Sequence, residues 1–346
     1  MQEIFQFIPA IVSFVSVLII MPPFIKKMYE HGFVGTNMNN YNKPKIAELG
    51  GAVVFFGFAL GAFSGIFVAT YLNLFKLDLG VFFAGLCTIA IIAFIGFIDD
   101  IIGWKKGIRQ WQHALFPIFA ALPLMAVRIA NPPISIPFIG LLPNEFFLPF
   151  GIVISFGFAY SLFAIPIGVT GASNATNMLA GLNGLEAGLA LLIISTLAII
   201  SIANGKIEAA VFALSIIGAL IAFLYYNWFP AKILGGDALT LMAGASIAVI
   251  SILGDMEKIG IALMILYFIE LFLKARTKFQ GESFGVPQKT GLLLSPKEKK
   301  SLTHYFMAIS PTTEKNVVKR ILFVQGIICI LALIAVYFNY IRIITI

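Results

Sequence analysis

The chain has 346 residues, of which 60% are hydrophobic and only 11% are charged. A soluble domain carries about 25% charged residues, so this composition excludes an ordinary soluble globular protein. The formal charge of +7 is explained by membrane topology and contacts with lipid headgroups, and we expect no nucleic-acid partner. The two cysteines, Cys87 and Cys329, lie in separate apolar runs, which argues against a disulfide and a zinc site.

Apolar stretches of about 20 residues recur along the chain, which is the length that a helix needs to cross a bilayer. We expect ten such helices in an all-α polytopic bundle, with residues 1–346 forming a single transmembrane domain. The predicted spans cover residues 4–24, 50–71, 79–98, 114–130, 146–168, 185–203, 207–225, 238–255, 257–274 and 318–341. The first has no basic residue before it and no small-residue cleavage site after it, so we expect a span and not a signal peptide.

The basic residues between the spans predict the orientation of the protein in the membrane. One set of alternate connections holds 18 of the 23 Lys and Arg residues, and the other set holds 5. The lysine-rich side is expected in the cytoplasm of a cell-membrane protein, which places both termini outside. Residues 275–317 then form a long cytoplasmic loop, and loops of this length are usually functional or disordered. Residues 131–144, with four prolines, favour a hairpin or an extended loop.

Ionisable side chains near membrane depth are costly, so their positions mark candidate functional groups. Asp99 and Asp100 end the third predicted helix, where lipid gives way to water. Adjacent helical residues point about 100° apart, so we expect each carboxylate to have its own partner. The alternative is a solvated helix end in which these aspartates pair with Lys105 or Lys106.

Asp237 opens the eighth predicted helix, and an Asp directly before an apolar run is most simply an N-cap. It lies on the same predicted membrane face as the aspartates of the third helix. The connector at residues 170–188 adds Asn174 and Asn177, which share a helix face, although a turn-rich connector without further function is the alternative. Three carboxylates with Asn amides form an oxygen site suited to Mg²⁺, which completes its octahedron with water and substrate phosphates.

The remaining polar candidates lie in the predicted cytoplasmic loops. Lys43 is a candidate contact for phosphate oxygens, although most such lysines are solvated. His113 and His304 are, taken alone, more typical of structural or solvated positions than of catalysis. Glu270 and Lys274 form an i, i+4 pair that we interpret as structural.

Three stretches on this predicted face carry a resemblance to a known family. They are FIGFIDDII from Phe94, NATNMLAGLNGLEAG from Asn174 and LGGD from Leu234. In this order they resemble the polyprenyl-phosphate N-acetylhexosamine-1-phosphate transferases, and the second stretch is most similar to the eukaryotic and archaeal GlcNAc-1-phosphate branch. The bacterial MurNAc-pentapeptide branch usually has Asp where this chain has Ala180 and Asn183. The resemblance covers about Lys43 to Tyr305, and the family's ten-helix topology agrees with the charge count.

The resemblance implies transfer of a sugar 1-phosphate from a UDP-N-acetylhexosamine to polyprenyl or dolichyl phosphate, with release of UMP. For the GlcNAc branch this would be the first step of lipid-linked oligosaccharide assembly for N-glycans, and the composition fits an archaeal source. The implied cofactor is Mg²⁺, with Mn²⁺ as a substitute. Besides these substrates, the implied partners are membrane lipids and, as a candidate oligomer, a second copy in a homodimer.

The resemblance also assigns roles to residues. Asp237 and Asn177 match the metal ligands, and Asp99 and Asp100 match the aspartates assigned to the lipid-phosphate nucleophile and its activation. The substrate-binding candidates are Glu48 and Asn183, at nucleotide-recognition positions, and Lys43, Asn174, Glu186 and His304. The family's phosphate-binding lysine before the fourth helix is absent, and His113 or Arg109 are the candidates for its place.

The chemistry of phosphate transfer explains these residue types. A phosphate that attacks a pyrophosphate requires charge neutralisation and in-line positioning, with little covalent work for the protein. A phosphomonoester has a second pKa of about 6 and is largely dianionic at neutral pH. We therefore expect Asp99 or Asp100 to orient the acceptor or take its residual proton, and neither to act as a covalent nucleophile.

Two other classes of protein were weighed against this hypothesis. An ion-coupled secondary transporter would place charges near the bilayer midplane and repeats in its two halves. A CDP-alcohol phosphotransferase would show an Asp-Gly followed by Ala-Arg and spaced aspartates. Neither pattern is present in the sequence.

Overall fold

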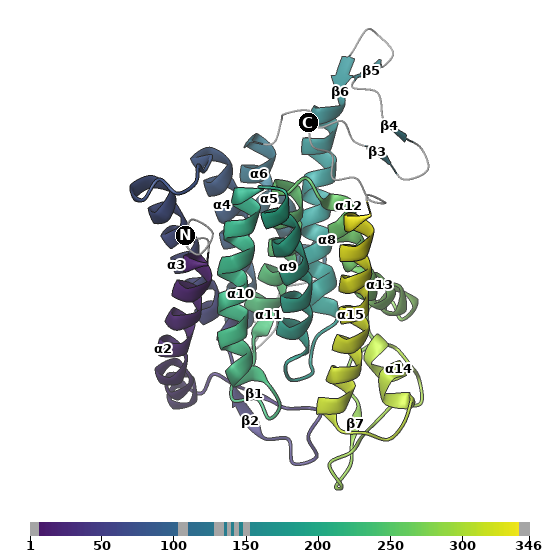
Figure 1. Ribbon diagram of the computed structural model, residues 1–346. Helices are drawn as coiled ribbons and strands as arrows, with labels where there is room; N and C mark the ends of the chain where they lie inside the picture. The colour runs from purple at the N-terminus through teal and green to yellow at the C-terminus, as the bar shows by residue number, and fades with distance from the viewer. Residues whose placement is uncertain are drawn as a thin grey trace.

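The computed structural model describes residues 7–102, 110–127, 135–136, 140–141, 145–147 and 153–338 (Figure 1). This part of the chain is mostly helical, and seven of its helices are long and apolar enough to cross a membrane. They are α2 (Ile8–His31), α3 (Gly50–Tyr71), α4 (Leu79–Ile102), α9 (Leu185–Ala203), α10 (Ile207–Asn227), α11 (Gly236–Leu253) and α15 (Glu314–Tyr337). The predicted all-α membrane bundle is confirmed at this level.

Three of the ten predicted spans are divided into shorter elements. Residues 114–130 contain most of α5 (Gln110–Ala120) and all of α6 (Leu122–Val127), and residues 257–274 contain α12 (Glu257–Leu263) and most of α13 (Ile265–Arg276). The first of these spans breaks between Ala120 and Leu122, just before Pro123, which lacks the amide hydrogen of a helical bond, whereas Pro117 lies inside α5.

The predicted helix over residues 146–168 is wrong in its first part. β5 (Glu145–Phe147) and β6 (Val153–Ser155) form an antiparallel hairpin there. The helical run starts only afterwards, as α7 (Phe156–Ala159), the π-helical turn η2 (Tyr160–Ala164) and α8 (Ile165–Met178). Short apolar pieces of about four to eight residues, such as those in the first part of this run, do not by themselves distinguish strand from helix.

Among the described residues, short hairpins and the helix α14 (Leu302–Ala308) lie in several of the connections at the ends of the bundle. Of the two alternatives expected for residues 131–144, a hairpin or an extended loop, the structure shows a hairpin, with β3 (Ser135–Ile136) paired to β4 (Gly140–Leu141). The first loop contains β1 (Val34–Thr36) and β2 (Lys45–Ala47). The predicted long loop at residues 275–317 is structured, with β7 (Val286–Pro287) paired to β8 (Leu293–Leu294), followed by α14 (Leu302–Ala308).

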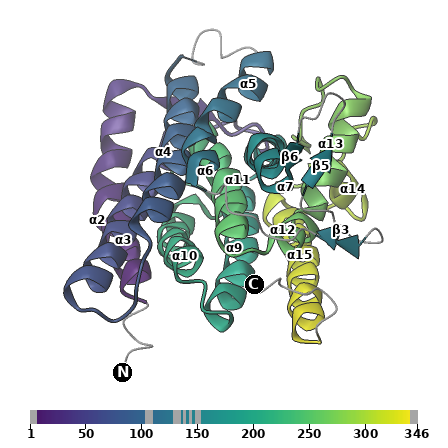
Figure 2. The same ribbon diagram turned by 90° about the horizontal axis from the view of Figure 1, so that it is seen from above.

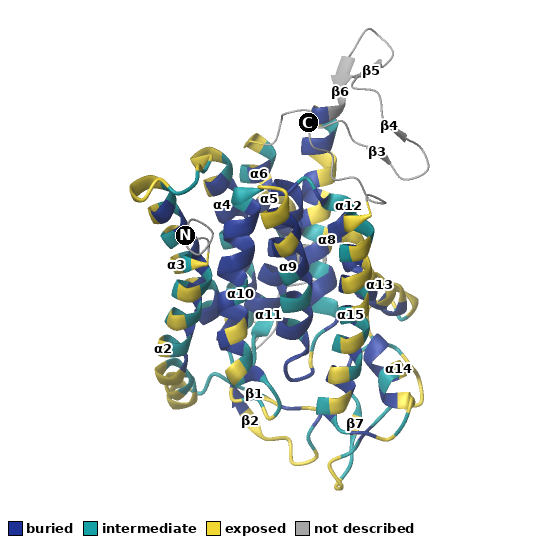
Figure 3. Ribbon diagram, in the orientation of Figure 1, coloured by how far each residue is buried: buried dark blue, intermediate teal, exposed yellow. Residues whose placement is uncertain are grey.

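Helix α11 is the centre of the bundle. In its apolar window 89% of residues are buried, against 22% in α2 and in α15, which lie on opposite sides in the view from above (Figure 2). The burial colouring shows the same gradient from the dark core to the exposed outer faces (Figure 3). The start of α11 is therefore enclosed by its neighbours.

Glycines bring α4 and α8 into backbone contact with α11. A Cβ atom on Gly96 of α4 would lie 2.5 Å from the carbonyl oxygen of Asp237. A Cβ atom on Gly244 of α11 would lie 2.2 Å from the carbonyl oxygen of Ala172 in α8. These close approaches place the ends of α4 and α8 beside the first turn of α11.

Candidate active site

Asp100, near the end of α4, caps the first turn of α11. Its Oδ1 accepts a hydrogen bond from the Asp237 amide at 2.6 Å, and its Oδ2 accepts one from the Ala238 amide at 3.0 Å. Gly236 has a positive φ of 71°, and a Cβ there would lie 2.4 Å from Asp100 Oδ2. Glycine is therefore required for this approach.

The interpretation of Asp237 as an N-cap is wrong. The cap position is Gly235, which offers no side-chain bond, and Asp237 lies inside the first helical turn. The unpaired amides of that turn are satisfied by Asp100 instead. The Asp237 side chain is thus left for other contacts.

Asp99 and Asn177 meet the Asp237 side chain. The buried Asp99 carboxylate and the Asn177 side chain are both in hydrogen-bond contact with it. Asn177 Oδ1 also accepts a hydrogen bond from Thr240 Oγ1 at 3.1 Å. Asp99 and Asp100 therefore have separate partners, as their adjacent helical positions predicted. Lys105 and Lys106, the alternative partners, lie outside the described residues.

This arrangement fits a divalent cation. The carboxylates of Asp99 and Asp237 repel one another unless a proton or a cation lies between them. In the part of the chain that the structure describes, no group of three or more His, Cys, Asp and Glu side chains is placed to hold a metal. The Asp237 carboxylate and the second lone pair of Asn177 Oδ1 are a small set of protein ligands, which is what Mg²⁺ takes when water and substrate phosphates complete its shell.

A cavity of about 250 Å³ lies beside Asp237. Its walls come from the β1–β2 loop, the α8–α9 connection, the start of α11 and Phe284. The sequence-predicted site residues in its lining are Glu48, Asn177, Asn183, Glu186 and Asp237. The structure thus brings together groups that are almost 190 positions apart in the sequence.

A backbone ladder joins the first loop to the start of α11. The Leu234 amide donates to the Ala47 carbonyl at 2.8 Å, and the amides of Gly50 and Gly51 donate to the carbonyls of Leu234 and Gly235 at 3.0 and 2.8 Å. A Cβ on Gly51 would lie 2.4 Å from the Leu239 amide nitrogen. The double glycine therefore permits the pairing that holds this loop against α11.

Glu48 follows β2 and faces the cavity. A Cβ on Gly35 of β1 would lie 2.0 Å from Glu48 Oε1, so the glycine leaves room for the carboxylate. Burial raises the pKa of the Glu48 carboxyl above its usual value. Glu48 also lies within electrostatic range of Asp100, so carboxylates from the β1–β2 region and from α4 act on one another at this site.

The α8–α9 connection is tied by carboxylates and amides. Glu186 Oε1 accepts from the Gly181 amide at 2.6 Å, and the Asn183 amide donates to Glu314 Oε1 at 2.7 Å. The side-chain nitrogen of Asn183 is buried without a hydrogen-bond partner, although its residue lines the cavity. A ligand acceptor would satisfy this group.

Two residues of this region were missed from the sequence. Glu314 opens α15 and is buried, and Asn227 ends α10, where its Oδ1 accepts from the Gly184 amide at 3.0 Å. Asn227 also donates to the Ile233 carbonyl at 2.8 Å. Their positions at helix ends on the same side as the aspartates were the available signal.

Three predicted substrate residues lie away from the cavity lining. Asn174 sits one turn before Asn177 and donates to the Thr170 carbonyl of its own helix at 2.9 Å. Lys43 is exposed, with a positive φ of 45°. His304 is buried in α14. Arg109 and the side chain of His113 lie outside the described residues, so their predicted roles stay predictions.

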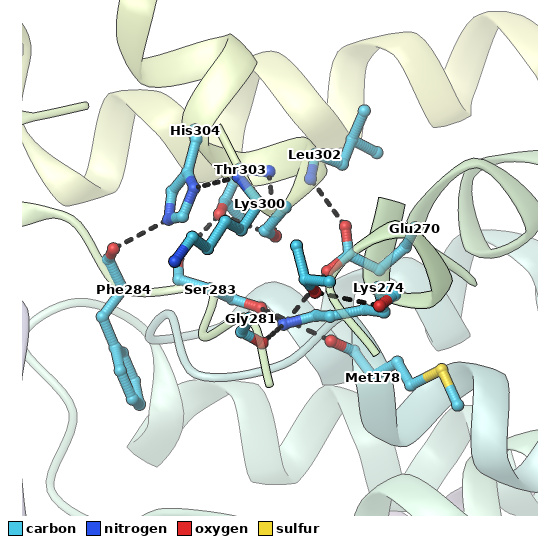
Figure 4. Close-up of polar contacts among 12 residues, drawn as sticks. Met178, Glu270, Lys274, Gly281, Ser283, Phe284, Lys300, Leu302, Thr303 and His304 are labelled. Carbon is cyan, nitrogen blue, oxygen red and sulfur yellow. Dashed lines mark hydrogen bonds and ion pairs between the residues drawn. The ribbon is translucent and has the colours of Figure 1, made fainter. Parts of the chain in front are cut away.

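The structural role predicted for Glu270 and Lys274 is confirmed, and the pair is buried (Figure 4). Lys274 Nζ lies 3.4 Å from Glu270 Oε1, and the lysine donates to Ser283 Oγ at 3.0 Å. Glu270 Oε2 accepts from the Leu302 amide at 2.6 Å. The pair therefore anchors the segment between α13 and α14 to α13.

A bundle of apolar helices with an acidic, amide-lined cavity at the start of its central helix defines an integral membrane protein with a polar site at one end. The chain belongs to glycosyl transferase family 4, whose model matches residues 82–255. This range contains Asp99, Asp100, Asn177, Asn183 and Asp237.

Relatives with assigned names support the same family. The chain is 36% identical over 331 residues to a Saccharolobus solfataricus protein named "Putative UDP-N-acetylglucosamine--dolichyl-phosphate N-acetylglucosaminephosphotransferase", with 95% of each chain covered. A Sulfolobus acidocaldarius protein of the same name is 34% identical, with 96% of each chain covered. The "Probable undecaprenyl-phosphate N-acetylglucosaminyl 1-phosphate transferase" of Bacillus subtilis is 31% identical, with 70% of this chain and 62% of the relative covered.

Proposed function

We propose that the chain transfers N-acetylglucosamine 1-phosphate from UDP-GlcNAc to a polyprenyl or dolichyl phosphate and releases UMP. The observation that carries this proposal is the meeting of Asp99, Asn177 and Asp237 beside an amide-lined cavity. The names of the archaeal relatives support the donor and the acceptor. The product would enter lipid-linked oligosaccharide assembly as its first sugar-bearing intermediate.

Mg²⁺, or Mn²⁺ in its place, would be held by Asp237 and Asn177 and would neutralise charge on the donor pyrophosphate. The contact of Asp99 with Asp237 supports a role for Asp99 in orienting the acceptor phosphate or receiving its residual proton. Asp100 has both oxygens bonded to the backbone of α11, so its role is to position Asp237. This division of roles follows from the different partners of the two aspartates.

The cavity beside Asp237 is the proposed donor site. Glu48, Asn183 and Glu186 line it, and the unpartnered side-chain nitrogen of Asn183 is available to an oxygen of the nucleotide. The exposed Lys43 is a candidate to bind the donor phosphates. Arg109 or His113 is the candidate to take the place of the missing phosphate-binding lysine. Asn174 acts in this proposal by supporting the helix that carries Asn177.

The proposed topology keeps ten crossings by counting each divided span once. α12 and α13 together run from Glu257 to Arg276, about 30 Å at 1.5 Å per residue, which matches a bilayer core. The excess of Lys and Arg on the side of the donor cavity supports a cytoplasmic site and both termini outside.

The test uses purified protein with Mg²⁺, radiolabelled UDP-GlcNAc and a short polyprenyl phosphate, and it measures label extracted into the organic phase. Wild type is expected to transfer label, and Asp237→Ala is expected to lose at least about a hundredfold in rate, as for removal of one essential charge-stabilising group. Transfer only from another UDP-sugar would overturn the GlcNAc assignment. No transfer from any UDP-sugar would overturn the proposed reaction and favour the transporter alternative.

A further inference from the structure

A single peptide group, between Phe284 and Gly285, is held at both of its polar atoms. The Phe284 carbonyl oxygen lies 2.9 Å from His304 Nε2 (Figure 4). The Gly285 amide donates to Asn39 Oδ1 at 3.0 Å. The peptide group is therefore fixed from opposite sides by α14 and by the loop between β1 and β2.

The tautomer of His304 is set by a second contact. The Lys300 amide donates to His304 Nδ1 at 3.1 Å, so Nδ1 is an acceptor and the ring proton resides on Nε2. Burial, together with the charges of Lys274 and Lys300, lowers the pKa of His304 and favours this neutral ring. His304 thus donates to the Phe284 carbonyl and has no nitrogen left for a substrate.

Asn39 connects the same peptide group to the α8–α9 connection. Its side-chain nitrogen donates to the Gly181 carbonyl at 2.8 Å while its oxygen accepts from Gly285, and the residue is buried. Its own amide donates to Asn37 Oδ1 at 3.0 Å, which fixes the turn of the loop. One carboxamide therefore spans two segments that lie 142 and 246 positions away.

These contacts determine where the Phe284 ring lies. A Cβ on Gly181, which has a positive φ of 102°, would lie 2.7 Å from the Phe284 ring, so ring and backbone are in close contact. Among the described residues that line the cavity, Phe284 is the one aromatic side chain. An aromatic face is the apolar group suited to a flat heterocycle, since every base has a π-face.

We propose that Asn39 and His304 are positioning residues of the donor site, which act by holding Phe284 as a cavity wall against the nucleotide of the donor. This inference rests on the proposed function and assigns His304 an indirect role, in place of direct substrate contact. Neither side chain touches the reacting atoms. Their effect is therefore expected on donor binding and not on the chemical step.

The test measures initial rates against UDP-GlcNAc concentration at saturating polyprenyl phosphate. Asn39→Ala and Phe284→Ala are each expected to raise KM for the donor about tenfold and to leave kcat within about twofold. When Asn39→Ala and Phe284→Ala are combined, the increase in donor KM should not exceed that of Phe284→Ala alone. The effects of two substitutions that act through one group are not additive. The Kd of UDP-GlcNAc, measured by calorimetry without acceptor, should increase in each variant by the same factor as the donor KM.

Conservative replacement separates positioning from general structural support. Gln retains a nitrogen donor near the place of Nε2, so His304→Gln should keep the donor KM near wild type, whereas His304→Ala should raise it. Asn42→Ala, at an exposed position in the same loop, is the matched control. If Asn39→Ala fails to fold, the Phe284 and His304 variants carry the test.

The inference is overturned if wild type transfers label and these variants leave donor KM and binding unchanged, or if the double variant multiplies the single effects. A selective rise in KM for the polyprenyl phosphate would also overturn it. Absence of transfer by wild type is a different outcome, which would overturn the proposed function and this inference together.

Discussion

The Asp100 carboxylate of α4 accepts the backbone amide of Asp237 at 2.6 Å, so one aspartate of the site orients the helical turn that carries another. An acidic group at a helix N-terminus is favoured by the helix dipole as well as by the hydrogen bond. Because Asp99 contacts the Asp237 side chain, the two neighbouring aspartates are expected to differ in what they contribute.

Substitution of the two aspartates should separate stability from catalysis. Asp100→Asn turns a side-chain NH2 group, which cannot accept, towards one of the two backbone N–H groups that now donate to Asp100. The free energy of unfolding should fall by about 1–2 kcal/mol, as for loss of a helix cap. Asp99→Asn removes a carboxylate that repels Asp237, so its Tm should equal or exceed that of wild type while transfer is lost. Thermal unfolding in detergent and the transfer assay measure the two effects. A larger loss of Tm in Asp99→Asn than in Asp100→Asn would contradict the roles assigned to the two aspartates.

Gly96→Ala should disrupt the contact between α4 and α11. The new Cβ would lie 2.5 Å from the Asp237 carbonyl, which is backbone and cannot rotate away, so we expect about 1–3 kcal/mol of destabilisation and loss of transfer. Gly168→Ala is the matched control, because no atom lies within 4 Å of a Cβ at that helical position. Equal stability and equal transfer in the two variants would show that the close approach of Gly96 to α11 is unimportant.

Removing one partner of the buried Glu270–Lys274 pair should be costly. Glu270→Gln leaves the lysine charge buried, and we expect a loss of about 3–5 kcal/mol, with a smaller loss in the double variant Glu270→Gln, Lys274→Met. The exposed pair of Glu298 and Lys300 provides the comparison, since Glu298→Gln should change stability by less than about 1 kcal/mol. Thermal unfolding of the four proteins measures these differences. A similar cost at both pairs would argue against the anchoring role.

His304 predicts a pH dependence of stability. Its pKa is lowered in the folded state, so below about pH 6.5 the unfolded chain binds a proton that the folded protein does not. Stability should therefore fall as pH decreases from 7 towards 5, and His304→Gln should remove this part of the dependence. Glu48, with a raised pKa, acts in the opposite sense, so the difference in Tm between wild type and His304→Gln is the measurement. A difference independent of pH would contradict the neutral ring.

The sequence predicts those parts of the structure that depend on local pattern. Long apolar runs identify the seven uninterrupted spans, and the prolines of residues 131–144 exclude a helix there without deciding between a hairpin and an extended loop. The run at residues 146–168 misleads because its apolar residues serve both a hairpin and a helix. The break at Met264 between α12 and α13 has no proline or glycine at that position to announce it.

Within the site, side-chain type and position predicted the cavity residues better than their roles. Glu48, Asn183 and Glu186 were identified and line the cavity. The cap of α11 could not be assigned correctly, because Asp100 lies 137 positions before the amide that it accepts. Asn39 was missed for the same reason, since Gly181 and Gly285, which its side chain bonds, are contributed by distant segments.

The long sequence separation between Asn39 and the residues that its side chain bonds has a consequence for how the site forms during translation. The loop that carries Asn39 is synthesised early, yet Gly181 and Gly285 follow 142 and 246 residues later. The support that Glu314 gives to the Asn183 backbone amide comes only with α15. A nascent chain can therefore insert most of its helices before the walls of the cavity beside Asp237 are complete, and the cavity is completed only near the end of translation.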